Sequence, residues 1–193
     1  PYSNNALVKV VPATGVMTGY STSAYGSFEG ASATGRGHLW LTPYSAPAVV
    51  RFDTATGSMA TFSSWPGTFS KTVTSLSGAT FDGSRHWMFP FTGTWVIGIH
   101  TDDGTMTGFD ATTWTGISLG STTHFAGGVY TGKTSLWLIP SRCDSVVHLD
   151  TVTGIATGYK NWPTGFAAYA NIGSVNNFYT GTFDGQYLWL APV

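Results

Sequence analysis

The stretch that decides the fold lies late in the sequence: Phe183-Asp184-Gly185-Gln186-Tyr187-Leu188-Trp189-Leu190-Ala191-Pro192. Looser copies of it run over residues 33–43, 81–90 and 130–140. Each copy passes through a glycine turn into an apolar segment around a tryptophan and ends at a proline. Self-similarity at a fixed spacing is the mark of a repeat architecture, so the repeat guides the interpretation of the rest of the chain.

Working outward from the tryptophan, one period of about 47 to 52 residues holds four short candidate strands. A segment of small residues comes first, the tryptophan segment second and a segment rich in valine and isoleucine third. A turn containing glycine, such as Gly57, leads to a fourth segment that ends in an aromatic residue. Frequent glycine, proline and β-branched residues disfavour helix. Four strands per period, repeated four times, predict an all-β protein, a four-bladed β-propeller with four-stranded blades.

Two features favour a propeller over a β-sandwich. Tryptophan segments such as Leu39-Trp40-Leu41 are apolar on both alternating faces, whereas one face of a sandwich strand is normally polar. In a propeller, neighbouring blades cover both faces. The first strand carries small residues, as in Gly78-Ala79 and Gly127-Gly128, which suits the crowded position where the blades converge on the axis.

The beginning and the end of the sequence read as complementary halves of one repeat. Residues 6–20 match a third and a fourth strand, and residues 179–193 match a first and a second strand. The sequence therefore predicts one domain, residues 1–193, with its last blade closed by these N- and C-terminal half-blades, which would protect strand edges. The alternative is that the half-blades pair between successive chains and form a head-to-tail fibre. The predicted blades are 30–62, 78–109, 127–159, and 179–193 together with 6–20.

Composition excludes several classes of protein. Charged residues make up only 9% and the net charge is −1, which argues against nucleic acid as a partner because binding it requires a basic face. No apolar run approaches the roughly 20 residues of a membrane-spanning helix. Cys143 is the only cysteine, so its thiol is either buried and inert or reactive. Because the sequence starts at Pro1, we expect a processed product or a segment of a longer protein.

The repeat resembles that of streptogramin-lyase and NHL propellers. The resemblance rests on Leu-Trp-Leu-x-Pro, Val-Val-Arg-Phe-Asp and Thr-Ala-Thr-Gly within residues 39–57, with equivalents across the chain. Repeats of that family are usually shorter and make larger rings, and the period of this chain departs from that pattern. In blade number the chain is similar to hemopexin-like domains, whose repeat sequences do not match. The resemblance to the lyases implies a histidine-based elimination assisted by a metal.

Candidate catalytic groups are few. None of the five histidines has the spacing of metal ligands, and three of them, His38, His86 and His148, occupy ordinary polar strand positions. His100 and His124 break the repeat pattern and are the candidates for an enzyme. Glu29 is the only glutamate, which excludes a pair of glutamates of the glycosidase type.

The carboxylates follow the repeat. Asp82 and Asp184 open the same turn in different copies, where aspartate side chains accept hydrogen bonds from nearby backbone amides. The residues by themselves therefore predict no catalytic site, no metal and no cofactor.

Aromatic residues in the predicted connections are the better candidates for binding. Tyr44, Phe91 and Trp95 follow the tryptophan strand, and Tyr169 and Asn176 fall in the longest irregular segment. Exposed aromatic side chains in such places could stack on sugar rings or anchor a partner. Tryptophans that recur between repeats are expected to pack between the blades instead; these are Trp65, Trp114 and Trp162.

The sequence thus predicts a non-catalytic propeller, extracellular or at the cell surface, that serves as a binding or structural module of a larger repetitive assembly. Its partner would be a protein or a carbohydrate. Low charge, the lack of a catalytic signature and the half-repeats motivate this prediction. The alternatives are a fibre subunit joined head-to-tail through its half-blades and a streptogramin-lyase-like enzyme.

Overall fold

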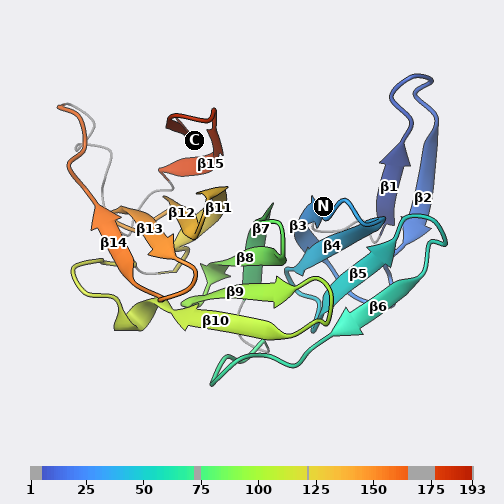
Figure 1. Ribbon diagram of the computed structural model, residues 1–193, viewed down its shortest axis with the longest axis horizontal. Helices are drawn as coiled ribbons and strands as arrows, with labels where there is room; N and C mark the ends of the chain where they lie inside the picture. Colours follow the sequence, from blue (N-terminus) through green and yellow to red (C-terminus); the bar gives the residue numbers. More distant parts are fainter. Residues whose placement is uncertain (1–5, 72–74, 121, 165–176, 193) are drawn as a thin grey trace.

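The computed structural model describes residues 6–71, 75–120, 122–164 and 177–192. The regular secondary structure in these ranges is antiparallel β-strand apart from one short 3-10 helix, Ala111–Thr113. Its strands form three four-stranded and two two-stranded sheets, which follow one another along an open arc (Figure 1). No helix in these ranges is long and apolar enough to cross a membrane.

Each four-stranded sheet is one blade whose strands are consecutive in sequence. Blade 1 contains β3 (Phe28–Ala33), β4 (His38–Pro43), β5 (Val49–Asp53) and β6 (Met59–Phe62). Blade 2 contains β7 (Ser75–Phe81), β8 (Arg85–Thr92), β9 (Trp95–His100) and β10 (Met106–Asp110). Blade 3 contains β11 (Phe125–Gly132), β12 (Ser135–Pro140), β13 (Val146–Asp150) and β14 (Ala156–Tyr159). The half-blades are β1 (Ala6–Val10) with β2 (Met17–Ser21), and β15 (Phe178–Phe183) with β16 (Leu188–Pro192).

Aspartates hold the turns where the repeat places them. The Oδ1 atom of Asp82 accepts hydrogen bonds from the backbone amides of Ser84 and Arg85 at 2.7 and 2.6 Å. Its Oδ2 atom accepts a hydrogen bond from the indole Nε1 of Trp87 at 2.7 Å. Asp184 makes the same contacts, including one of 2.7 Å from the indole of Trp189. The same hydrogen bonds therefore shape the first turn of a complete blade and that of a half-blade.

The first strands of successive blades lie side by side at the inner edge of the arc, where β3 contacts β7, β7 contacts β11 and β11 contacts β15. Their backbones approach so closely that a Cβ atom on Gly30 would lie 2.8 Å from the carbonyl carbon of Gly78. A Cβ atom on Gly78 would in turn lie 2.9 Å from the Cα of Gly127. Both Gly30 and Gly78 have positive φ values, 126° and 60°. The small residues of the first strand are therefore required by this approach.

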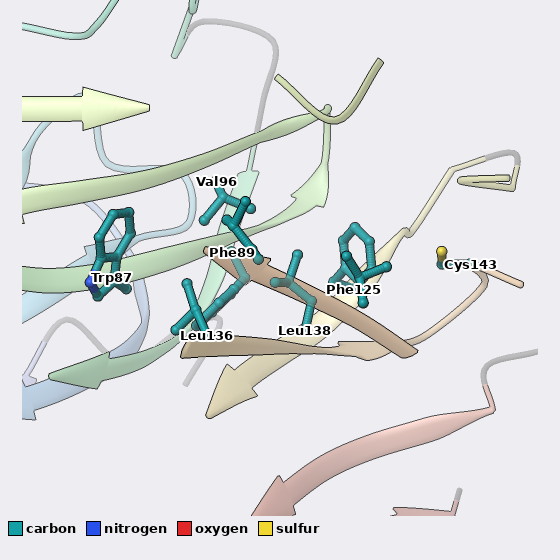
Figure 2. Close-up of a cluster of buried hydrophobic side chains, with 9 residues drawn as sticks. Trp87, Phe89, Val96, Phe125, Leu136, Leu138 and Cys143 are labelled. Atoms are coloured by element: carbon teal, nitrogen blue, oxygen red, sulfur yellow. The ribbon is translucent and has the colours of Figure 1, made fainter. Parts of the chain in front are cut away.

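The hydrophobic core lies between blades rather than inside one sheet. Figure 2 shows side chains of blade 2 meeting side chains of blade 3, all fully buried; those labelled are Trp87, Phe89, Val96, Phe125, Leu136, Leu138 and Cys143. A second cluster, which includes Trp40, Met88 and Ile97, fills the junction of blades 1 and 2. Burial on both faces explains why the tryptophan strands are apolar throughout. Burial also raises the pKa of the Cys143 thiol to about 12, so this thiol is inert at neutral pH.

The connecting tryptophans pack between the blades, as the sequence predicts. Trp65 lies against Phe69 with ring centroids 5.0 Å apart, and Trp114 packs on the core between blades 2 and 3. Trp162 stacks on Phe178 at 5.8 Å, and its indole Nε1 donates a hydrogen bond to the carbonyl oxygen of Asp144 at 3.1 Å.

The last blade is not closed within the chain, which corrects the predicted pairing of 179–193 with 6–20. The hairpins β1–β2 and β15–β16 are separate sheets in the described part of the chain, and they lie at opposite ends of the arc (Figure 1). The physical reason is the curvature of the arc: the blades follow one another so gradually that the two half-blades lie too far apart to pair (Figure 1).

Candidate functional site

The connections of the arc fall on two faces. Because successive strands alternate in direction, the first-to-second and third-to-fourth turns share one face, here called the hairpin face. The second-to-third turns and the blade-to-blade connections share the other, here called the loop face. Loops held by a rigid scaffold are where binding and catalytic groups concentrate. The connections that follow β6 and β10 are longer than the turns of the hairpin face. A candidate site is therefore expected on the loop face.

Tyr44 and Phe91 come together on the loop face. Their ring centroids lie 6.0 Å apart with an interplanar angle of 57°, and both side chains are half-buried. Tyr44 belongs to blade 1 and Phe91 to blade 2, and each directly follows the proline of its tryptophan strand. Two of the five residues predicted to bind a ligand therefore form an aromatic pair across a blade junction.

Polar groups converge beside this aromatic pair. Lys71 Nζ donates a hydrogen bond to the carbonyl oxygen of Tyr44 at 2.8 Å, and burial lowers the pKa of Lys71 to about 8. The hydroxyls of Ser27 and Ser45 are hydrogen-bonded at 2.5 Å. A cavity of about 20 Å³ is lined by Ser27, Phe28, Glu29 and Tyr44, which is room for about one water molecule. The sequence does not reveal Lys71 as a member of this site, because its partner Tyr44 lies 27 positions earlier in the chain and no local pattern links the two residues.

The other three predicted ligand-binding residues are placed differently. Trp95 begins β9 and is half-buried, with its ring 6.4 Å from that of Phe69. The ring also lies over Gly67 and Gly108, where added Cβ atoms would meet it at 2.9 and 3.0 Å. Its contacts are thus those of a packed residue at the blade junction. Tyr169 and Asn176 lie outside the described residues. A ligand-binding role for these three residues stays a prediction.

The two histidines considered for catalysis lie on opposite faces. His124 precedes β11 on the loop face, is only 8% exposed, and donates from Nδ1 to the carbonyl oxygen of Leu119 at 2.7 Å. Its backbone amide also donates to the carbonyl oxygen of Phe91 at 3.2 Å. His100 ends β9 on the hairpin face, with Nδ1 3.5 Å from a carboxylate oxygen of Asp103. The structure therefore does not combine His100 and His124 in one site.

His86 is the residue whose environment the sequence does not reveal. It is fully buried between blades 1 and 2, with Nδ1 2.6 Å from Ser32 Oγ and Nε2 3.0 Å from Thr42 Oγ1. The Thr42 hydroxyl donates to the carbonyl oxygen of Gly78, so it accepts from Nε2–H, and Nδ1 accepts from the Ser32 hydroxyl. Burial lowers the pKa of His86 to about 3. A neutral, enclosed imidazole of this kind joins two blades and is shielded from any substrate.

The described residues contain no cluster of three or more histidine, cysteine, aspartate or glutamate side chains that could hold a metal ion. The metal implied by the resemblance to the lyases therefore has no ready set of ligands in these ranges.

Neither protein-family comparison nor a search of curated proteins finds a match to this sequence. Solved structures do match. A catalytically inactive variant of virginiamycin B lyase from Staphylococcus aureus, solved with quinupristin, aligns with a TM-score of 0.70 and 18% identity over 98% of this chain and 57% of that chain. The extracellular domain of a protein described as a hybrid two-component system of B. thetaiotaomicron aligns with a TM-score of 0.58 and 13% identity over 84% of this chain and 19% of that chain. A protein described as a 6-phosphogluconolactonase of Bacteroides uniformis aligns with a TM-score of 0.56 and 14% identity over 97% of this chain and 56% of that chain.

The chain thus spans a little over half the length of the lyase and the lactonase-like protein, and about a fifth of the third protein. At these identities the likeness shows the fold alone, and the same fold serves enzymes and an extracellular domain among these structures. The match to a streptogramin lyase agrees with the resemblance carried by the repeats. Repeat pattern, blade geometry and structural likeness together show that this chain has a β-propeller fold, with repeats that resemble those of streptogramin lyases.

Proposed function

We propose that this chain is a non-catalytic extracellular binding module that holds a carbohydrate on its loop face, beside Tyr44 and Phe91. The observation that carries the proposal is the meeting of these two rings, from different blades, at 6.0 Å. Aromatic rings pack well on the apolar faces of sugar rings, and a pair on a rigid scaffold does so at little cost in conformational entropy.

The polar groups beside the two aromatic rings suit the same ligand. Carbohydrates combine apolar ring faces with many hydroxyls, which need donors and acceptors placed around the aromatic platform. The ammonium of Lys71, the carboxylate of Glu29 and the hydroxyls of Ser27 and Ser45 are of the required kinds. The low overall charge of the chain also suits a neutral ligand. An extracellular location is supported by the extracellular propeller domain among the similar structures.

Tyr44→Ala and Phe91→Ala are each expected to weaken carbohydrate binding about tenfold, because each removes one face of the aromatic platform, worth about 1.4 kcal/mol. A glycan array would identify the ligand, and calorimetry would then measure the affinity of each variant. Tyr187→Ala is the matched control, because Tyr187 is 57% exposed and lies on the hairpin face. The proposal fails if no glycan binds, or if the two variants bind as tightly as the control.

A lyase-like enzyme is the second candidate, and the position of His124 favours it. This histidine is on the loop face and is tied by its backbone to Phe91, and a solved structure of similar fold is a streptogramin lyase. The test is turnover of quinupristin by the chain and by His124→Ala. Turnover that the substitution abolishes would replace the binding proposal, whereas no turnover by either protein would remove the enzyme candidate.

A further inference from the structure

The two half-blades are complementary parts of one blade, held at opposite ends of the arc (Figure 1). The hairpin β15–β16 supplies a first and a second strand, and β1–β2 supplies a third and a fourth. Side chains that complete blades bury are exposed here. Trp189 is 58% exposed whereas its counterparts Trp40 and Trp87 are fully buried. Val8 is 53% exposed whereas its counterpart Val50 is 1% exposed.

A recurring contact between an aromatic ring and a glycine joins each sheet to the next. The aromatic residue near the end of a fourth strand lies over the glycine in the third-to-fourth turn of the following blade. The observed pairs are Tyr20 with Gly57, Phe62 with Gly104, and Phe109 with Gly154. One ring and one glycine of this series lack such a contact. Tyr159 is 51% exposed, and a Cβ atom added to Gly15 would meet nothing within 4 Å.

In complete blades, the residue that pairs with the tryptophan across the sheet lies on the third strand, and the described hairpin β15–β16 has no third strand beside it. Trp40 is paired across the sheet with Arg51, whose guanidinium lies 5.9 Å from the indole. Trp137 is paired with His148, with ring centroids 4.9 Å apart. Lys9 of β1 holds the same repeat position as Arg51 and His148. Pairing of β16 with a β1 strand in this register places the Lys9 ammonium over Trp189, where a cation–π contact is favourable.

A cavity marks where inner strands are missing at the other end of the arc. It has a volume of about 180 Å³ and is lined by residues of β1, β3 and β4, among them Leu7, Phe28 and Leu41. Elsewhere, the first two strands of the preceding blade contact this side of a first strand: β3 and β4 contact β7, β7 and β8 contact β11, and β11 and β12 contact β15. By this pattern, the element that fits beside β3 is a hairpin of first and second strands such as β15–β16.

We propose that a second copy of this chain completes both half-blades, so that two arcs close into one ring. Each copy contributes three complete blades, and two composite blades with strand order β15-β16-β1-β2 join the copies. By analogy with the observed pairing of Trp40 with Arg51, Trp189 of one copy lies opposite Lys9 of the other. At each junction Tyr159 then covers Gly15 of the other copy, and the β15–β16 hairpin fills the cavity beside β3.

The curvature of the arc favours two copies over an open fibre. Nearly the whole chain superposes on about half of a larger propeller, with 98% of this chain on 57% of the lyase and 97% on 56% of the lactonase-like protein. Two such arcs supply about as many blades as one ring needs. A head-to-tail contact that closes gives a ring, and one that does not close gives a filament.

Sedimentation equilibrium of the 193-residue chain tests the proposal. We expect a single species of twice the 20.5 kDa chain mass across a wide range of concentration. In that species, the backbone amides of the facing edges of β1 and β16 should exchange with solvent as slowly as those of β5 and β4. A monomer, a concentration-dependent ladder of larger species, or a dimer whose β1 and β16 amides exchange freely would each overturn it.

Val8→Glu combined with Val10→Glu is the decisive variant. Both valines are exposed in the single chain, at 53% and 47%, so the variant folds, but the composite blade would bury two carboxylates. We expect a folded monomer with unchanged far-UV circular dichroism. Val152→Glu is the matched control, since Val152 is 76% exposed on the third-to-fourth turn of blade 3, and it should remain a dimer. If the double variant is a folded dimer, β1 is not the interface and the proposal is wrong.

Discussion

Trp87→Ala is expected to lower the free energy of unfolding by about 3–5 kcal/mol. The indole of Trp87 is fully buried and stacks on Phe109 with ring centroids 6.1 Å apart. It also lies over Gly98, where an added Cβ atom would meet it at 2.7 Å. Truncation opens a cavity between blades 2 and 3 that these neighbours are too constrained to fill, and it removes the donor that Asp82 holds at 2.7 Å.

Trp189→Ala is the matched control for this substitution. Trp189 occupies the same repeat position and makes the same hydrogen bond, at 2.7 Å, to Asp184, yet it is 58% exposed. In the Val8→Glu, Val10→Glu monomer, its loss should cost clearly less, about 1–2 kcal/mol, because more than half of this residue is already exposed to solvent. Urea unfolding followed by circular dichroism measures both variants. Equal losses at the two positions would show that burial between blades does not govern the stability of the tryptophan strands.

The strand order and the fold could be predicted from the sequence because each blade repeats the same local pattern. The tryptophan, the apolar third strand and the turn glycine recur at fixed spacing, and each has a local cause. Closure could not be predicted, because it depends on curvature. Curvature is set by how whole blades pack on one another, through contacts such as those of β3 with β7 and of β7 with β11, and no local sequence pattern encodes it. In addition, the sequences of two complementary half-blades are equally compatible with pairing within one chain and with pairing between two chains.

The candidate site could be predicted in part, because the repeat pattern also places two of its residues. Tyr44 and Phe91 hold the same repeat position, so adjacent blades bring them together. Lys71 and His86 were not predictable as members of a blade junction. Lys71 comes from a connection without a repeat pattern, and His86 looks like other histidines that begin a tryptophan strand. Only the neighbouring blade buries His86, through Ser32 and Thr42.

Acidification from pH 7 to pH 5 is expected to lower the free energy of unfolding by about 2 kcal/mol through His86 alone. Burial lowers the pKa of His86 from 6.5 to about 3 in the folded chain. As the pH falls below 6.5, the unfolded chain binds a proton at this residue and the folded chain does not. The contribution to stability is therefore fully present above pH 6.5 and is lost progressively as the pH falls from there toward 3.

Unfolding titrations at pH 7, 6 and 5 measure the slope of the free energy of unfolding against pH. They are done on the Val8→Glu, Val10→Glu monomer, so that subunit dissociation does not contribute. His86→Gln should flatten the slope, whatever its effect on stability at pH 7, whereas His38→Gln, at a half-exposed position, should retain it. The carboxylates of Asp82 and Asp150, whose pKa values are lowered from 3.8, contribute only at lower pH, since unfolded aspartates begin to bind protons near pH 4. The window from pH 7 to 5 thus separates the contribution of His86 from that of the aspartates. An unchanged slope in His86→Gln would mean that this imidazole is not held neutral between the blades.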